Sequence, residues 1–290
     1  MSIQPLKLLI SGATGQVGSA VLQALHNSPH QLVAATRQAP HGQAPAGLQW
    51  CQLDFARGIF PDTNFDAIFL MRPPQLADQR LFEAFLRPLD RKTRIVFLSV
   101  AGAERKAYLP HAKIEACIQQ LGFQHCFVRP GYFMENLLST LWPTLAAEGR
   151  IVLPAGNLKL NWVSVSDIAL AVAQALTDPA MPASLSLLNQ QQHSFGEVIQ
   201  LINQHCGTAL RYTSPPLPAY LARCLWQGQS LSYTAVMLLL HYLPRRRPDP
   251  PPAFQRTSGA TAASRLAASK ILFNSTGHAL PGCRRRANKA

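Results

Sequence analysis

The chain has 290 residues, 48% hydrophobic and 14% charged, a composition typical of a globular protein large enough to bury a full core. No run of about 18 apolar residues occurs, and the N-terminus lacks the pattern of a secretory signal, so we expect a cytoplasmic protein without membrane contact. The net charge of +13 is concentrated after Arg245, where ten basic residues face one acid, whereas the first 244 residues carry only +4. A polyanion such as nucleic acid is therefore an unlikely partner for the body of the protein.

The stretch Leu6–Gly18 reads LKLLISGATGQVG, an apolar run that ends in three glycines spaced three residues apart. The pattern predicts a strand, a tight turn and a helix that opens a dinucleotide-binding fold. Gly12 permits the sharp turn, Gly15 lets the backbone approach a pyrophosphate, and Gly18 lets the helix pack closely. The helix N-terminus offers N–H groups and a positive dipole to phosphates.

The second predicted strand, residues 31–36, ends at Thr36 and Arg37. At this place in a dinucleotide-binding fold an acidic residue would bind the adenosine ribose hydroxyls and repel a 2′-phosphate. A cation without a neighbouring acid favours the phosphorylated cofactor, so we expect NADP(H) to be preferred over NAD(H).

Further apolar strands are predicted to alternate with helices along the first half of the chain. Such strands demand a parallel sheet that helices cover on both faces, a Rossmann-type doubly wound α/β fold whose ligands lie at the carboxyl ends of the strands. The predicted strands are 48–53, 66–71, 94–99 and 124–129, and the predicted helices are 76–86 and 109–121.

Beyond Gly131 the alternation loosens into helices near 133–148, 168–176, 195–205, 219–226 and 233–243, with short extended pieces at 151–153, 161–165, 185–188 and 210–213. We expect a dinucleotide-binding domain over residues 1–150 and a smaller α+β substrate or lid region over 151–244. Residues 245–290 are rich in Arg, Pro, Ala and Ser and are expected to form a disordered tail, either an interaction arm or a replacement of the native C-terminus by a frameshift.

Four segments together resemble the NmrA-like branch of the atypical short-chain dehydrogenases: GATGQVG at 12–18, HAKIEACIQQLGF at 111–123, VRPGYFMENLL at 128–138 and WVSVSDIALAVAQAL at 162–176. This branch includes bacterial NAD(P)H-dependent quinone and azo-dye reductases, triphenylmethane reductases and catalytically inert redox-sensing regulators. The resemblance covers about residues 6–243.

The resemblance implies a role for each matching residue. Lys113 and Tyr132 are the candidate catalytic residues, with Lys113 reaching the nicotinamide ribose and Tyr132 beside the nicotinamide. The alternatives are a surface lysine on an amphipathic helix for Lys113 and core packing for Tyr132 and Phe133. The implied cofactor-binding residues are Gly12, Thr14, Gly15, Gln16, Val17, Thr36, Arg37, Asp54, Phe55, Met71, Arg72, Ser99, Val100, Lys113, Pro130, Gly131, Tyr132 and Phe133. The candidate substrate residues are Tyr108, Asn136 and Trp162.

The usual acid of a short-chain dehydrogenase is missing from its place. In Tyr-x-x-x-Lys the cation lowers the pKa of a phenol on the same helix face, but Leu109 stands four residues before Lys113. Tyr108 reaches the pocket only if it lies on a loop before the helix. Electron-poor acceptors such as quinones and azo compounds need less help, because water or a nearby hydroxyl can supply the proton.

Two functions follow, and the sequence leaves both open. The first is hydride transfer from NADPH to a quinone or a similar small acceptor. The second is an inert NADP(H) sensor that binds a protein partner, and a homodimer is compatible with either. No metal is expected, because neither the nine histidines nor the six cysteines show metal-binding spacing, and the cysteines are expected to be reduced and buried.

Overall fold

The computed structural model describes residues 4–38, 47–62, 64–189 and 191–246. The described chain forms two compact units, between which it passes after Gly131, after Trp162 and after Leu187. The units therefore consist of alternating segments, which the single boundary expected at residue 150 does not capture. The expectations for the tail from residue 247 onward lie outside the described residues.

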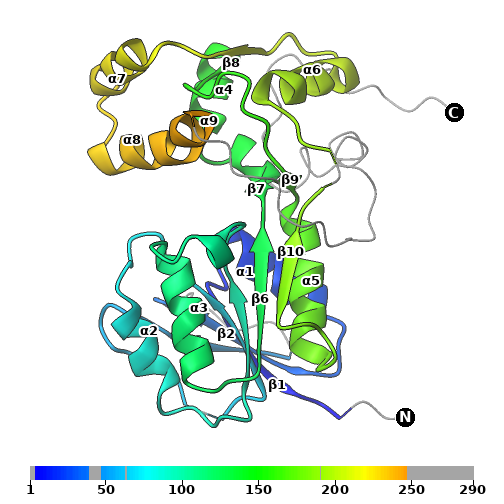
Figure 1. Cartoon of the computed structure of the whole chain (residues 1–290). Coiled ribbons are helices and arrows are strands. Elements are labelled where there is room, and N and C mark those ends of the chain that lie inside the picture. The colour runs from blue at the N-terminus through cyan, green and yellow to red at the C-terminus, as the bar shows by residue number, and fades with distance from the viewer. Residues whose placement is uncertain (1–3, 39–46, 63, 190, 247–290) are drawn as a thin grey trace, which may run out of the picture. The chain divides into compact units, whose positions relative to one another are not determined.

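A seven-stranded parallel sheet forms the centre of the first unit, in the order β10-β6-β5-β4-β1-β2-β3 (Figure 1). This confirms the predicted Rossmann-type α/β class. The strands are β1 (Lys7–Ser11), β2 (Gln31–Thr36), β3 (Leu48–Gln52), β4 (Ala67–Met71), β5 (Arg94–Leu98), β6 (His125–Pro130) and β10 (Ser184–Leu187).

Helices cover both faces of this sheet, and its central strands are buried except at Lys7 and Met71, which are partly exposed. On one face α1 (Gln16–Leu25) packs against α5 (Val165–Thr177), and on the other α2 (Gln79–Leu86) packs against α3 (Pro110–Gln120). The second face holds a core of aromatic and aliphatic side chains that includes Phe82 and Phe97.

Buried Arg94 explains why α5 and β10, which follow the loosened part of the chain, belong to the first unit. Its guanidinium donates to the carbonyl oxygens of Ala175 at 2.8 Å, Pro179 at 3.4 Å and Met181 at 3.2 Å. A buried cation must be paired or hydrogen-bonded. The end of α5 and the residues after it therefore satisfy a charge on β5, a link across more than 80 residues of sequence.

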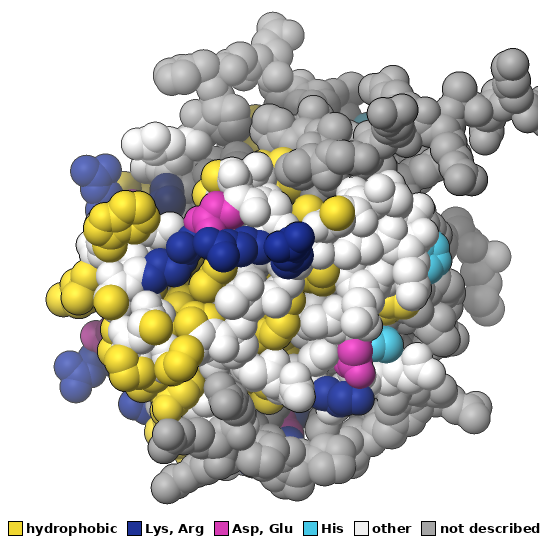
Figure 2. Space-filling model, turned by 90° about the horizontal axis from the view of Figure 1, so that it is seen from above, with side chains coloured by type: hydrophobic (Ala, Val, Ile, Leu, Met, Phe, Trp, Pro, Cys, Tyr) yellow, Lys and Arg dark blue, Asp and Glu magenta, His cyan; other side chains and the backbone are white. Residues whose placement is uncertain are grey.

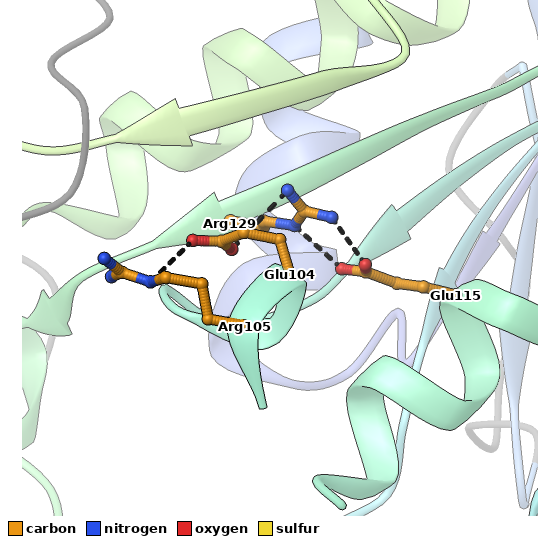
Figure 3. A network of polar contacts seen from close by, with 4 residues as sticks. All are labelled: Glu104, Arg105, Glu115 and Arg129. Atoms are coloured by element: carbon orange, nitrogen blue, oxygen red, sulfur yellow. Dashed lines mark hydrogen bonds and ion pairs between the residues drawn. The ribbon is translucent and has the colours of Figure 1, made fainter. Parts of the chain in front are cut away.

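A second buried charge ties α3 to β6 (Figure 3). Arg129 donates to both carboxylate oxygens of Glu115, at 2.9 and 2.6 Å, and lies 3.5 Å from Glu104, which in turn pairs with Arg105 at 3.4 Å. Glu104 and Arg105 lie on a short 3₁₀ helix, Ala103–Arg105, before α3. These pairs hold α3 in place against the carboxyl end of β6.

The second unit has its own core, in which Trp162, Phe195 and Leu137 are fully buried. Its strands are β7 (Tyr132–Phe133), β8 (Arg150–Val152), β11 (Arg211–Thr213) and the first residue of β9 (Trp162–Val163); its helices are α4 (Trp142–Glu148), α6 (Phe195–Cys206), α7 (Leu217–Trp226), α8 (Leu231–Met237) and α9 (Leu243–Arg246). Strand β11 pairs with β8, and β7 pairs with β9.

The helix expected over 133–148 is divided. The chain forms β7, a 3₁₀ turn over Met134–Leu137, and then α4, which carries Pro143 in its first turn. A proline inside a helix removes a backbone hydrogen bond and clashes with the preceding turn, so a helix begins at this proline more readily than it runs through it.

The helix expected over 233–243 is present but changes its geometry midway. It runs from α8 through a π-helical turn, Leu238–Tyr242, into α9. Large apolar side chains are exposed along this segment and the end of α7, and Figure 2 shows hydrophobic groups gathered on this side of the molecule. They are Leu225, Trp226, Leu231, Val236, Leu239, Leu240 and Leu243.

The described cysteines Cys51, Cys117, Cys126, Cys206 and Cys224 are free thiols, and burial raises the pKa of Cys51 to about 11. Within the described ranges no group of three or more His, Cys, Asp or Glu residues is placed to hold a metal ion. No helix in this part of the chain is both long and apolar enough to cross a membrane.

The buried pair predicts a stability effect. Glu115→Leu should lower the free energy of unfolding by about 3 kcal/mol, because Arg129 loses its bidentate partner and keeps only the longer contact with Glu104. Urea unfolding measures the change. The double variant Glu115→Leu/Arg129→Met should recover most of the loss, and equal stability of wild type and the single variant would contradict the role of the pair.

Candidate functional site

The turn after β1 forms as the glycine spacing predicts. Gly12 has a φ of +61°, and Gly15 donates to its carbonyl oxygen at 2.8 Å and caps α1. A Cβ at Gly18 would lie 2.2 Å from the Gly12 oxygen, so this position tolerates only glycine. The tight turn and the close helix packing are confirmed. The exposed first turn of α1, with Thr14 and Gln16 beside Gly15, remains the predicted phosphate site.

The turn lies at the switch point of the sheet, where β1 is flanked by β2 and β4. Ser11 Oγ accepts from the Met71 amide at 2.9 Å, and a Cβ at Gly12 would lie 2.8 Å from Met71 Sδ. Met71 therefore packs against the glycine turn, through its side chain at Gly12 and its amide at Ser11. Ligands of open α/β sheets lie outside the carboxyl ends of the strands at this point.

At the end of β2, Thr36 is half-buried and Arg37 is exposed. Gln52 donates to the Arg37 carbonyl at 3.0 Å, and Leu53 donates to the Thr36 carbonyl at 2.9 Å, so β3 fixes the backbone at this corner. The backbone of Arg37 is therefore fixed at the carboxyl edge of the sheet, and its exposed side chain extends from there.

Asp54 and Phe55 play different roles after β3. Asp54 Oδ1 accepts from the amides of Ala56 and Arg57, at 3.0 and 3.2 Å, which closes the turn. The Phe55 ring is buried and stacks on Phe82 with centroids 4.5 Å apart. The Phe55 ring is therefore part of the core, and the predicted cofactor contact of Phe55 remains a prediction for its backbone alone.

Polar groups meet at the carboxyl ends of β4 and β5. Arg72 Nη1 donates to the carbonyls of Pro73, Pro74 and Leu76, at 3.1, 3.0 and 2.7 Å, and its Nε lies 3.5 Å from His111 Nε2. Ser99, 2% exposed, has no hydrogen-bond partner for Oγ among the described residues. Val100 follows it, half-exposed.

Helix α3 begins at Pro110, with Leu109 as its N-terminal cap. Tyr108 thus lies before the helix and is 70% exposed, which meets the condition set for it to act from a loop. Lys113, in the second turn, is exposed. Its catalytic role remains a prediction.

The remaining predicted residues fall on both sides of Gly131. Pro130 and Gly131 end the first of the chain segments that form the first unit, and Gly131 donates to the Leu187 carbonyl at 3.2 Å. Tyr132, Phe133, Asn136 and Trp162 belong to the second unit. Trp162 is fully buried there and its indole donates to the His193 carbonyl at 2.8 Å, so its expected contact with a substrate is corrected to a core role.

The Tyr132 hydroxyl is engaged inside the second unit. It lies 3.1 Å from Nε2 of His241, whose Nδ1 is 2.9 Å from the Met237 carbonyl. A carbonyl oxygen only accepts, so Nδ1 carries the hydrogen and Nε2 of the neutral ring accepts from Tyr132. Burial raises the pKa of Tyr132, and hydrogen bonding to Asn136 lowers it by less. Tyr132 is therefore a weak acid here.

Sequence reasoning missed both His111 and His241. His111 is the first residue of HAKIEACIQQLGF, a segment of the family resemblance, but neither histidine stands in a metal-binding or catalytic motif. The lone polar position of His241 in the apolar run VMLLLHYL is the one available signal, and its partner Tyr132 lies 109 residues away. The π-helical turn at His241 is a feature that often marks functional positions.

Comparisons with known proteins agree with this architecture. The model of the NmrA-like family matches residues 91–238, and that of the NAD dependent epimerase/dehydratase family matches residues 8–78. A prestalk A differentiation protein of Dictyostelium discoideum is 26% identical over 71% of this chain and 72% of its own length. An NAD(P)H azoreductase of Xenophilus azovorans is 26% identical over 71% of this chain and 76% of its own.

Two solved structures share the fold at 18% sequence identity. A triphenylmethane reductase of Citrobacter sp. matches with a TM-score of 0.71, over 90% of this chain and 99% of that one. An NADPH-dependent quinone oxidoreductase of Escherichia coli, in complex with NADPH, matches with a TM-score of 0.65, over 93% and 95%.

The parallel sheet, its switch point and the glycine turn define a Rossmann-like α/β protein of the NAD(P)-binding class. The chain belongs to the NmrA-like family.

His241 predicts a pH dependence of stability. Burial lowers its pKa from 6.5 to about 4, so the unfolded chain takes up a proton below pH 6.5 that the folded protein does not accept until about pH 4. Stability should therefore fall as the pH drops through this range, by at most about 1.4 kcal/mol per pH unit from this group. Urea unfolding of wild type and His241→Gln measures it, since glutamine retains an acceptor for Tyr132 and does not titrate. Parallel losses in both proteins would exclude His241 as the source.

Proposed function

We propose that this protein binds NADP(H) and is an oxidoreductase that reduces a quinone or a similar small, electron-poor acceptor. The observation that carries the proposal is the glycine turn at the switch point of the sheet, together with the buried Oγ of Ser99 at the same carboxyl edge, which has no hydrogen-bond partner in the described ranges. In native proteins a buried hydroxyl without a partner is rare, and one at a ligand-binding edge is readily explained by a ligand.

The residues of this edge fit a dinucleotide. The first turn of α1 presents backbone N–H groups and a helix dipole to phosphates, and no acidic side chain lies in that turn. Gly15 leaves room for a pyrophosphate to approach its backbone. The nearest atom to an added Cβ, the Gly12 oxygen at 3.2 Å, belongs to the turn itself. Thr36, Arg37 and Asp54 surround the end expected to hold the adenosine.

When bound, the reduced nicotinamide supplies a hydride to the acceptor. Lys113 would bind the nicotinamide ribose. Ser99 and Val100, at the end of β5, would line the cofactor. In the described part of the chain Leu109 occupies the usual position of the acid, and the proton of Tyr132 is directed at His241. The proton for the product then comes from water or from an exposed hydroxyl such as that of Tyr108.

The missing acid limits the acceptor to compounds that take up hydride without help from a protein acid. Several relatives are named for acceptors of this class. The azoreductase of Xenophilus azovorans and the quinone oxidoreductase of Escherichia coli are named for such acceptors and for NAD(P)H or NADPH. The triphenylmethane reductase structure is also known in complex with NADP(H). These names support the proposal as analogies.

A second candidate is a catalytically inert NADP(H) sensor that changes its affinity for a protein partner. The observation that favours the sensor is that Tyr132 is a weak acid hydrogen-bonded to His241. The same observation argues against a catalytic role for this phenol. Both candidates need the same dinucleotide site.

The first test is a titration of the purified chain with NADPH and NADH, followed by a panel of quinones and azo dyes with nicotinamide absorbance as the readout. We expect saturable NADPH binding and turnover with at least one acceptor. Binding without turnover across the panel would favour the sensor, and absence of dinucleotide binding would exclude both.

The second test addresses the 2′-phosphate. Arg37→Asp should raise the Kd for NADPH by about 10- to 100-fold, because charge-assisted hydrogen bonds contribute about 1.5–3 kcal/mol. The Kd for NADH should change much less. Arg37→Lys, which keeps the charge, is the control. Equal losses for the two dinucleotides would remove the assignment of Arg37.

A further inference from the structure

His111 shares one face of the sheet edge with Ser99 and Arg72. In the parallel register of β4 and β5, Leu70 pairs with Phe97, so Arg72 and Ser99, each two residues further, extend from the same face. Both Leu70 and Phe97 belong to the core beneath α2 and α3. The His111 ring, in the first turn of α3, lies 6.1 Å from the Phe97 ring.

Arg72 determines which nitrogen of His111 carries the hydrogen. The guanidinium has only donors, so at the 3.5 Å contact Nε2 of His111 is the acceptor and the hydrogen of the neutral ring is on Nδ1. Arg72 is itself held by three carbonyls of the loop that follows β4. Burial and the charge of Arg72 lower the pKa of His111 to about 4, so the ring is neutral near pH 7.

The position of this group relative to the halves of a dinucleotide follows from the strand order. The glycine turn after β1 receives the pyrophosphate, and the ends of β2 and β3 receive the adenosine. Strands β4 and β5 lie on the other side of β1, so their ends face the second nucleoside.

We propose that His111 Nδ1–H and Ser99 Oγ hydrogen-bond the nicotinamide nucleoside of the bound dinucleotide, and that Arg72 is the positioning residue that fixes the His111 tautomer. The inference rests on the proposed dinucleotide binding and holds for enzyme or sensor.

The test compares NADPH with adenosine 2′,5′-bisphosphate, which lacks the nicotinamide nucleoside. His111→Leu should raise the Kd for NADPH by about 10-fold, because a neutral hydrogen bond is lost. The Kd for the bisphosphate should stay within about twofold. His111→Asn retains an amide N–H near Nδ1 and should recover most of the NADPH affinity. Ser99→Ala should show the same selective loss, and melting temperatures verify folding.

The outcomes separate the two proposals. Unchanged NADPH affinity in His111→Leu, or equal losses for both ligands, would overturn the role of His111. If His111→Leu fails to fold, the variants His111→Asn and Ser99→Ala test the proposal instead. Weaker NADPH binding by Ser99→Ala alone supports the roles of His111 and Ser99. Unchanged NADPH affinity in both variants overturns these roles. Wild-type protein that binds neither ligand would contradict the dinucleotide site itself.

A second readout is independent of affinity. A long-range ¹H–¹⁵N spectrum of the histidine rings should show His111 as a neutral Nδ1–H tautomer that shifts on NADPH addition. In Arg72→Met this tautomer should lose its dominance, because the donor to Nε2 is gone. A neutral Nε2–H tautomer in the wild type would overturn the assignment of Arg72 as the positioning residue.

Discussion

The close approach of backbone at Gly12 and Gly18 is the contact on which the first unit depends. At Gly18 an added Cβ would come within 2.2 Å of the Gly12 oxygen, and at Gly12 it would come within 2.8 Å of Met71 Sδ. This contact fixes where β1 ends and α1 begins. It also places the first turn of α1 at the switch point between β1 and β4, so the edge of the sheet and a free helix N-terminus coincide. The first turn of α1 thus presents backbone N–H groups at this edge, the arrangement in which helix N-termini bind anions in other proteins.

Around this turn, buried polar groups are satisfied almost everywhere by groups distant in sequence. Arg94 is bound by carbonyls at the end of α5 and after it, and Arg129 by Glu115 and Glu104. These bonds hold α5 and α3 on the sheet. Against that background Ser99 is an exception, a buried hydroxyl without a partner among the described residues, at the same carboxyl edge of β4 and β5 as Arg72. The exception falls at the carboxyl edge, where a ligand of this fold is expected.

The second unit is built around aromatic packing. The Tyr132 ring contacts Trp162, Phe195 and His241, with centroids 4.9, 5.7 and 5.5 Å apart. Such edge-on contacts add to the stabilisation from burial. The Tyr132–His241 hydrogen bond satisfies both polar groups inside this cluster, which commits the phenol to structure and weakens it as an acid. The family resemblance placed Tyr132 at the chemistry, whereas its surroundings favour a structural contribution.

The sequence by itself determined the parallel sheet, the turn after β1 and the exposed cation after β2. Those features are local: apolar runs predict strands, and the glycine spacing predicts the turn. Tertiary structure alone decided that α5 and β10 join the first unit, that Phe55 and Trp162 are buried, and that His111 meets Arg72 and His241 meets Tyr132. The physical reason is that a local pattern specifies which element a residue joins, while its burial and polar partners depend on chain segments up to 109 residues away.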